Sequence, residues 1–217
     1  MEYLQLMCVD EIVSTLKDLC IAGAAVTTAF VAWKGVESWK RELQGKADFE
    51  VARNLIKATY QVRNSIQICR SPWLELFEFP EGYQHNKIER TSEDEGYAKL
   101  FIYNNRLKHV DDCIIEFDTT VLEAEALWGR IIEDKALALR KCTSELKSAI
   151  DSVIRDAYSG GSDFTSDKEF AQEMKEIVQN IDPKTNSFTK KINSAISDIE
   201  TLVRPHLSRN KQNLPMR

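Results

Sequence analysis

The longest apolar stretch of the chain runs from Leu19 to Trp33 and contains no charged residue. Lys34 ends this stretch, and the basic pair Lys40 and Arg41 follows within two helical turns. Over the rest of the chain, apolar residues recur every three or four positions among many charged ones. This contrast predicts an apolar N-terminal helix followed by a body of amphipathic helices.

The apolar stretch is a candidate transmembrane helix of borderline length. About 15 residues of α-helix span about 22 Å, whereas the hydrocarbon core of a bilayer is about 30 Å thick. The lysine at its end can snorkel to the interface, which extends the candidate span to residues 19–36. Aromatic and basic residues at its C-terminal end have the composition of a membrane interface: Trp33, Lys34, Trp39, Lys40 and Arg41. The alternative is that residues 19–33 form the buried core helix of a soluble bundle.

The charges that flank the stretch predict its orientation. Residues 1–18 form an amphipathic lead-in with four carboxylates and one lysine, whereas the C-terminal flank is basic. The positive-inside rule therefore predicts a single-pass protein of the bacterial inner membrane, with the N-terminus outside and the body in the cytoplasm. The acidic start also argues against a cleaved signal peptide. If the stretch is instead a core helix, the protein is cytoplasmic.

Heptad spacing predicts the helices of the body, at residues 46–70, 94 to about 128, 139–157, 166–180 and 185–203. Gly45 marks a soft joint before the first of them. Ser166 is the expected N-cap of the fourth, with Glu169 at the capping-box position, and Pro205 is expected to close the last. No proline interrupts residues 92–182, so residues 100–158 form either one rod or a hairpin that turns near residues 130–135.

Heptad seams pair either within one chain or between chains. Several such helices joined by loops favour an antiparallel bundle within the chain, and small seam residues such as Thr59 and Ala124 fit close helix approach. We therefore expect an all-α protein in which residues 37–204 form a cytosolic helical bundle. Residues 205–217 are expected to be a basic, flexible tail.

Composition narrows the functional classes. Gly and Pro are scarce, with eight and five in 217 residues, which disfavours all-β and dinucleotide-binding folds. The net charge of −5 argues against nucleic acid as a partner, because phosphate binding requires a basic surface. Five scattered cysteines without a CxxC pair indicate buried thiols in a reducing compartment.

One group of residues resembles a metal or acid–base site. His109, Asp112 and Glu116 have the spacing that places side chains on one helical face, with Asp111 and Asp118 beside them. However, a di-metal bundle site requires Glu-x-x-His pairs, which the sequence lacks, and these residues alternate with the apolar seam. We therefore expect a solvated face, and we predict neither catalytic residues, cofactor nor metal. The carboxylates Glu93, Asp94 and Glu95 are interpreted as helix-capping residues.

The stretch between Trp73 and Glu93 is the one long irregular segment in the pattern. Its first part interleaves the aromatic residues Trp73, Phe77 and Phe79 with Glu75, Glu78 and Glu81. Either the aromatic residues pack this loop onto the bundle, or they form a partner-docking loop, since exposed apolar side chains need a surface to bury against.

The residues between Trp39 and Pro72 follow the pattern W-x-x-x-L-x-G-K, E-x-A-R-x-L, Y-x-x-R and R-x-P. This pattern resembles uncharacterised bacterial proteins in which an N-terminal membrane helix leads into such a helix. The resemblance covers about the first third of the chain and implies a membrane anchor. The resemblance implies no activity, and it assigns no ligand to Arg53, Arg63 or Arg70.

The sequence therefore predicts a non-enzymatic, membrane-tethered helical interaction or scaffold protein. It would contact lipid through residues 19–36 and bind a protein partner or a second copy of itself. One alternative is a soluble helical bundle that binds a protein partner. Another is a membrane-perturbing effector or sensor of a phage-defence type, to which the small residues of the apolar stretch point.

Overall fold

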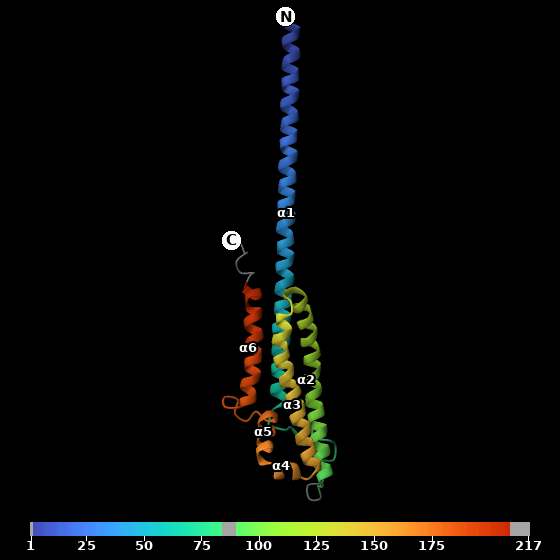
Figure 1. The fold of residues 1–217 in the computed structure, drawn as a ribbon. Helices are drawn as coiled ribbons and strands as arrows, with labels where there is room; N and C mark the ends of the chain where they lie inside the picture. The colour runs from blue at the N-terminus through green and yellow to red at the C-terminus, as the bar shows by residue number, and fades with distance from the viewer. Residues whose placement is uncertain (1, 84–89, 209–217) are drawn as a thin grey trace. The chain divides into compact units, whose positions relative to one another are not determined.

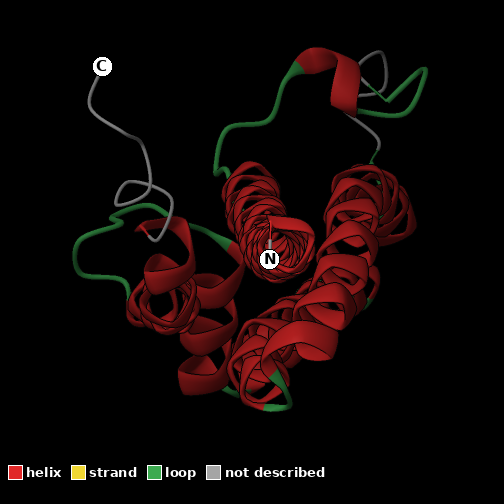
Figure 2. Ribbon diagram, turned by 90° about the horizontal axis from the view of Figure 1, so that it is seen from above, coloured by secondary structure: helices red, strands yellow, loops and turns green. Residues whose placement is uncertain are grey.

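The computed structural model describes the backbone of residues 2–83 and 90–208, and their side chains except those of residues 2–14 and 18. These residues form six α-helices and one short 3-10 helix, and no strand occurs among them (Figures 1 and 2). The all-α prediction is therefore confirmed. The chain divides into two compact units, Met1–Ala47 and Asp48–Arg217.

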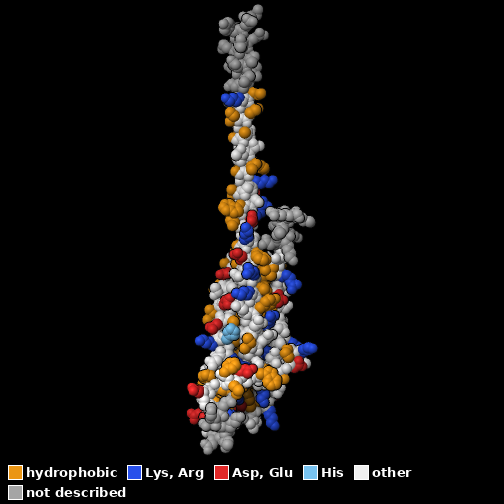
Figure 3. Space-filling model, turned by 180° about the vertical axis from the view of Figure 1, so that it is seen from behind, with side chains coloured by type: hydrophobic (Ala, Val, Ile, Leu, Met, Phe, Trp, Pro, Cys, Tyr) orange, Lys and Arg blue, Asp and Glu red, His pale blue; other side chains and the backbone are white. Residues whose placement is uncertain are grey.

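The first unit consists of the N-terminal part of helix α1, which spans Glu2–Cys69. Helix α1 continues through Gly45, where a joint was expected. An 18-residue window within Thr15–Cys69 has a mean hydropathy of 1.6, and none of it is buried. Apolar side chains lie on the surface of this part of α1 (Figure 3). The helix is thus long and apolar enough to cross a membrane, and its exposure differs from the alternative in which residues 19–33 are a buried core helix.

The second unit begins at Asp48, eleven residues later than the boundary expected after residue 36. The reason is that α1 stays exposed up to Ala47, and its core positions begin at Ala52. The C-terminal part of α1 is followed by η1 (Leu76–Glu78), α2 (Ser92–Trp128), α3 (Ile131–Tyr158), α4 (Ser162–Ser166), α5 (Lys168–Val178) and α6 (Ser187–Ser208).

Helices α2 and α3 form an antiparallel hairpin, which decides between the rod and the hairpin expected for residues 100–158 (Figure 1). Gly129 caps α2 with φ 79°, a backbone conformation that other residues rarely adopt. A second turn follows α3, where Gly160 and Gly161 also have positive φ. Helix α3 packs further against α5 and α6.

One hydrophobic core joins the second part of α1 to α2, α3, α5 and α6. All six seam positions expected in residues 46–70 are at most 1% exposed: Ala52, Leu55, Thr59, Val62, Ile66 and Cys69. On α2, the expected positions Val110, Phe117, Val121 and Ala124 are buried, whereas Leu107, Ile114 and Trp128 pack partly buried at the edge. Heptad spacing therefore identified the inner face of each long helix.

The residue predicted to cap the N-terminus of the helix at residues 166–180 was wrong by one position. Ser166 ends the short helix α4 instead, and its hydroxyl donates to the carbonyl of Asp163 at 2.7 Å. Asp167 caps α5, because its carboxylate accepts the backbone N–H of Phe170 at 2.9 Å. At the start of α2, Thr91 and Asp94 form a capping box, in agreement with the capping role expected for the acidic residues there.

Pro205 does not close the last helix, as expected, but lies inside α6. Proline removes one backbone hydrogen bond and usually breaks a helix. Here the turn that contains it is held by His206, whose Nδ1 lies 2.8 Å from a carboxylate oxygen of Asp48 and whose ring stacks on Trp128 at 4.1 Å. Trp128 Nε1 also donates to Asp48, at 2.5 Å. The tail predicted at residues 205–217 therefore begins as helix, and residues 209–217 lie outside the described part of the chain.

We expect Phe117→Asp to unfold the bundle and Glu116→Ala to leave its stability nearly unchanged. Phe117 is 0% exposed, so an unpaired carboxylate there costs on the order of several kcal/mol. Glu116 faces solvent, where substitutions usually change stability by less than about 0.5 kcal/mol. Circular dichroism melting of the detergent-solubilised full chain measures both variants. Equal destabilisation by the two would contradict this orientation of α2.

Candidate partner-docking loop

The segment that follows α1 exposes most of its apolar side chains. Trp73, Leu76 and Phe77 are 81%, 72% and 83% exposed, and Leu74 is 45% exposed. We call these four residues the apolar patch. Phe79, the third aromatic residue singled out in the sequence, lies partly buried and stacks on Tyr83 at 5.0 Å. Packing within the loop therefore accounts for Phe79, whereas Trp73 and Phe77 stay exposed.

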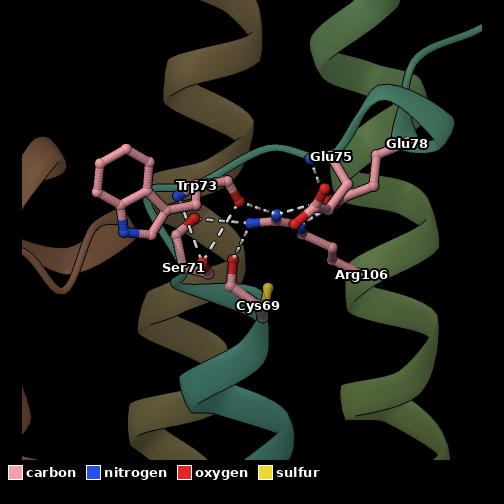
Figure 4. Close-up of polar contacts among 6 residues, drawn as sticks. All are labelled: Cys69, Ser71, Trp73, Glu75, Glu78 and Arg106. Atoms are coloured by element: carbon pink, nitrogen blue, oxygen red, sulfur yellow. Dashed lines mark hydrogen bonds and ion pairs between the residues drawn. The ribbon is translucent and has the colours of Figure 1, made fainter.

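Arg106 of α2 holds the backbone of this loop (Figure 4). Its Nη1 donates to the carbonyl oxygens of Cys69 and Ser71 at 3.2 and 2.8 Å, and its Nη2 donates to that of Trp73 at 2.8 Å. Its Nε and Nη2 also donate to the two carboxylate oxygens of Glu78, at 2.5 and 2.9 Å. One guanidinium thus fixes both ends of the segment that carries the apolar patch.

Glu78 completes this arrangement from inside the loop. Its carboxylate accepts the backbone N–H of Glu75 at 3.0 Å, and its own N–H donates to the carbonyl of Glu75 at 3.0 Å. Arg106 is 8% exposed and Glu78 is 16% exposed at their side chains, so the pair is largely shielded from water. Arg106 lowers the pKa of Glu78, and Glu78 raises the pKa of Arg106. The pair is therefore ionised at neutral pH, and its contribution to stability is lost as the pH falls through the lowered pKa of Glu78.

One exposed carboxylate lies within the apolar patch. Glu75, between Leu74 and Leu76, lies in solvent, whereas the charge of Glu78 is balanced by Arg106. The loop therefore presents four apolar side chains and one unbalanced negative charge, with a second exposed carboxylate, Glu81, further along the loop. Because its backbone is already fixed, a partner that binds here would pay little entropy to order it.

Sequence reasoning gave no role to Arg70, which the structure places just before the loop. Its side chain is 1% exposed, and its Nε donates to the carbonyl of Ile177 at 2.6 Å. Its two terminal nitrogens donate to Thr189 Oγ1, to the carbonyl of Glu176 and to Asn186 Oδ1, each at 2.9 Å. The guanidinium also lies over the ring of Phe188, 4.8 Å from its centroid.

All of the atoms that accept hydrogen bonds from Arg70 are neutral oxygens. Two are carbonyls of the last turn of α5, where the helix dipole is negative. Burial lowers the pKa of Arg70 to about 10, so it is still protonated at neutral pH. The sequence signal was weak, because an arginine at the end of an amphipathic helix resembles any solvated charge.

The group of acidic residues on α2 lies on its outer side. His109, Asp112 and Glu116 are exposed, as expected for a solvated face. Asp111 and Asp118 pair with Lys147 and Arg140 of α3, at 2.5 and 2.7 Å. Among the described residues, no group of three or more His, Cys, Asp or Glu side chains is placed to hold a metal ion.

The described cysteines differ in their surroundings. Cys20 is exposed, whereas Cys69, Cys113 and Cys142 are buried in the core. Burial raises the pKa of the Cys69 thiol to about 11, so it stays protonated and unreactive at neutral pH. The side chain of Cys8 lies outside the described part of the chain.

The residues expected at a membrane interface all lie exposed on α1. Trp33 and Trp39 are 71% and 64% exposed, and Lys34, Lys40 and Arg41 also face solvent. Arg41 forms an ion pair with Glu37 one turn away, at 3.3 Å.

Comparisons of the chain with protein-family models, with curated proteins and with solved structures found no match. The resemblance carried by the residues between Trp39 and Pro72 therefore stays a prediction.

We expect Arg106→Lys to loosen the loop without unfolding the bundle. A lysine has three donors on one nitrogen and cannot reproduce the five contacts of the planar guanidinium. The backbone amides of Ser71, Glu78 and Phe79 should exchange with deuterium about tenfold faster, which corresponds to about 1.4 kcal/mol. Arg53→Lys, on the exposed side of α1, is the matched control. Unchanged exchange in Arg106→Lys would show that other contacts hold the loop.

Proposed function

We propose that this chain is a non-enzymatic, membrane-tethered helical protein that binds a protein partner through the apolar patch. The observation that carries the proposal is the exposure of Trp73, Leu74, Leu76 and Phe77 on a backbone fixed by Arg106. Exposed apolar side chains on a fixed loop are the usual form of a docking site, with an aromatic residue as its anchor. The bundle serves as the scaffold that positions this loop.

The chemistry of the patch favours a protein over a lipid surface. Glu75 lies between Leu74 and Leu76 of the patch, Glu81 follows in the same loop, and carboxylates are repelled by the anionic lipids of a cytoplasmic leaflet. The fitting partner has an apolar groove rimmed by lysine or arginine side chains, which matches both the patch and its charge.

The membrane tether is supported by the exposed apolar face of α1. Residues 19–33 carry no charge, and none of the most apolar window of α1 is buried. An apolar helix in this state needs lipid or another protein to cover it. The basic residues that follow the stretch favour a cytoplasmic location of the bundle at a bacterial inner membrane.

The full chain should partition with membranes and resist extraction by alkaline carbonate. Replacing Val26 with Arg puts a charge near the centre of the candidate span, which costs about 2.5–3.5 kcal/mol on the biological insertion scale. This variant should shift toward the soluble or aggregated fraction, whereas Gln44→Arg, outside the span, should not. Recovery of the unmodified chain in the soluble fraction without detergent would refute the tether.

The docking role is tested by a photo-crosslinking residue introduced at position 76 in the native cells. A discrete protein adduct should form, and Trp73→Ser with Phe77→Ser should abolish it. The control is Ile115→Ser with Leu122→Ser, which removes two apolar side chains of α2 that are 65% and 63% exposed. Charge reversal at Glu75 and Glu81 should weaken the adduct if the partner is basic. An adduct that survives the patch substitutions would refute the assignment of the docking surface.

A further inference from the structure

The first unit has an apolar seam of its own, separate from the loop. Seven positions of α1 follow alternating steps of three and four residues: Ala22, Ala25, Ala29, Ala32, Val36, Trp39 and Leu43. All seven side chains are exposed. This spacing is that of the contact positions in a two-stranded helical coil, and it holds without interruption for three heptads.

The composition of the seam changes where the uncharged stretch ends. Its four positions before Lys34 are all alanine, and its three positions after Lys34 are large apolar residues, at 51%, 64% and 51% exposure. In lipid, helices associate through small residues that permit close approach, because burial of apolar surface gains nothing there. In water, large apolar residues drive association. Each part of the seam therefore has the residue type that its surroundings require.

Leu43, the last of the three large residues, needs a cover that lipid does not supply. Leu43 lies seven residues beyond Val36, which is about 10 Å along a helix. Charged residues surround this part of the seam on the other faces of α1, including Lys40, Arg41 and Glu42. A helix with such flanks lies beyond the hydrocarbon, so Leu43 is left for protein to cover, whereas Val36 ends the candidate span and Trp39 lies at its interface.

The charges beside the seam are compatible with a second copy of the same helix. Glu37 pairs with Arg41 at 3.3 Å, and Glu42 pairs with Lys46 at 2.8 Å, each one turn apart on α1. The positions next to the seam are Lys40 on one side and Glu42 on the other, and in a parallel pair the Lys40 side of each copy faces the Glu42 side of the other, so like charges do not meet. No charged residue occupies the seam between Ala22 and Leu43.

The orientation and the area also fit a second copy. Copies of one membrane protein insert in the same direction, so their seams lie parallel and at the same depth. The seam is about 32 Å long. Two Trp39 side chains alone can bury about 300–500 Å², and a specific interface needs about 1,000 Å² in total. The remaining six positions on each copy supply the difference.

We infer that α1 forms a parallel contact between two copies of this chain along the seam, which runs from the alanines of the candidate span through Val36 and Trp39 to Leu43 at its aqueous end. The inference rests on the proposed tether for its parallel orientation. It gives the protein two separate surfaces, one for its own copy and one for a partner.

Cysteine crosslinking of the full chain in membranes tests this contact. Cys8→Ser and Cys20→Ser remove the native thiols of the N-terminal part, and Val36→Cys and Leu43→Cys then place single thiols on the seam. Ser38→Cys and Gly45→Cys are the matched controls, two residues further on and on the opposite side of the helix. A disulfide forms only between Cα atoms less than about 7 Å apart, so the seam variants should form the covalent dimer on the order of tenfold faster.

A second pair of variants checks that the seam itself holds the contact. In the Leu43→Cys chain, Trp39→Asp should suppress the dimer, whereas Ser38→Asp should not. Equal crosslinking at all four positions would indicate random collision and overturn the inference. Membrane-bound protein without crosslinking would overturn it as well, while the tether would stand. Crosslinking of the seam variants in protein recovered from the soluble fraction would support the contact and refute the tether.

Discussion

The structure of the bundle depends on how the carbonyl groups at its helix ends are bound. The last carbonyls of a helix have no partner within the helix, and leaving them buried without one is costly. Here two arginines donate to them. Arg106 binds the carbonyl of Cys69, the last residue of α1, together with those of Ser71 and Trp73. Arg70 binds the carbonyls of Glu176 and Ile177 at the end of α5.

These two arginines connect the C-terminal end of α1 to the other helices of the bundle. Arg70 connects it to α5 and α6, and the carbonyl of Arg70 in turn accepts the backbone N–H of Asn180 at 3.0 Å. Arg106 connects it to α2. The chain leaves α1 between these two arginines, and the backbone of the loop that follows is held by Arg106. The apolar patch is thus exposed on a backbone whose position is fixed by the way the helix ends are bound.

Most of the bundle could be predicted from the sequence, because burial repeats with the helical period. The seam from Ala52 to Cys69 was identified residue by residue. The ends of the helices were harder, because they depend on contacts that no local pattern records. Pro205 was expected to end α6, yet His206 contacts Asp48 and Trp128, residues distant in the chain, and the helix continues. The hairpin at Gly129 was left open for a similar reason, since glycine is tolerated within a helix and also ends one.

The sequence showed that the composition of this loop is unusual, but it did not predict the conformation of the loop. Interleaved aromatic and acidic residues indicated an unusual segment, but the same residues fitted both a packed loop and a docking loop. The contact that distinguishes a docking loop from a packed loop is made by Arg106. This residue is 33 positions from Trp73, so no local spacing pattern relates the two. The role of Arg70 was missed because a charged side chain is expected to face solvent. Only the folded structure brings together enough neutral oxygens to bury its guanidinium. A guanidinium can be satisfied in this way because its five donors diverge in one plane, whereas an ammonium cannot.

The apolar residues outside the core are either isolated or grouped, and the proposed docking surface rests on the grouped ones. Ile115 and Leu122 are exposed on α2 among polar neighbours, and isolated apolar residues of this sort are normal on protein surfaces. The apolar patch and the seam of α1 are different: the patch gathers four exposed apolar residues within five positions of a fixed loop, and the seam repeats apolar residues over three heptads. A single exposed helix is only marginally stable in water, so an exposed apolar stretch such as residues 19–43 is stabilised by a cover. The proposed tether would cover its alanine part, and the proposed contact between two copies would cover the part where the charged residues begin.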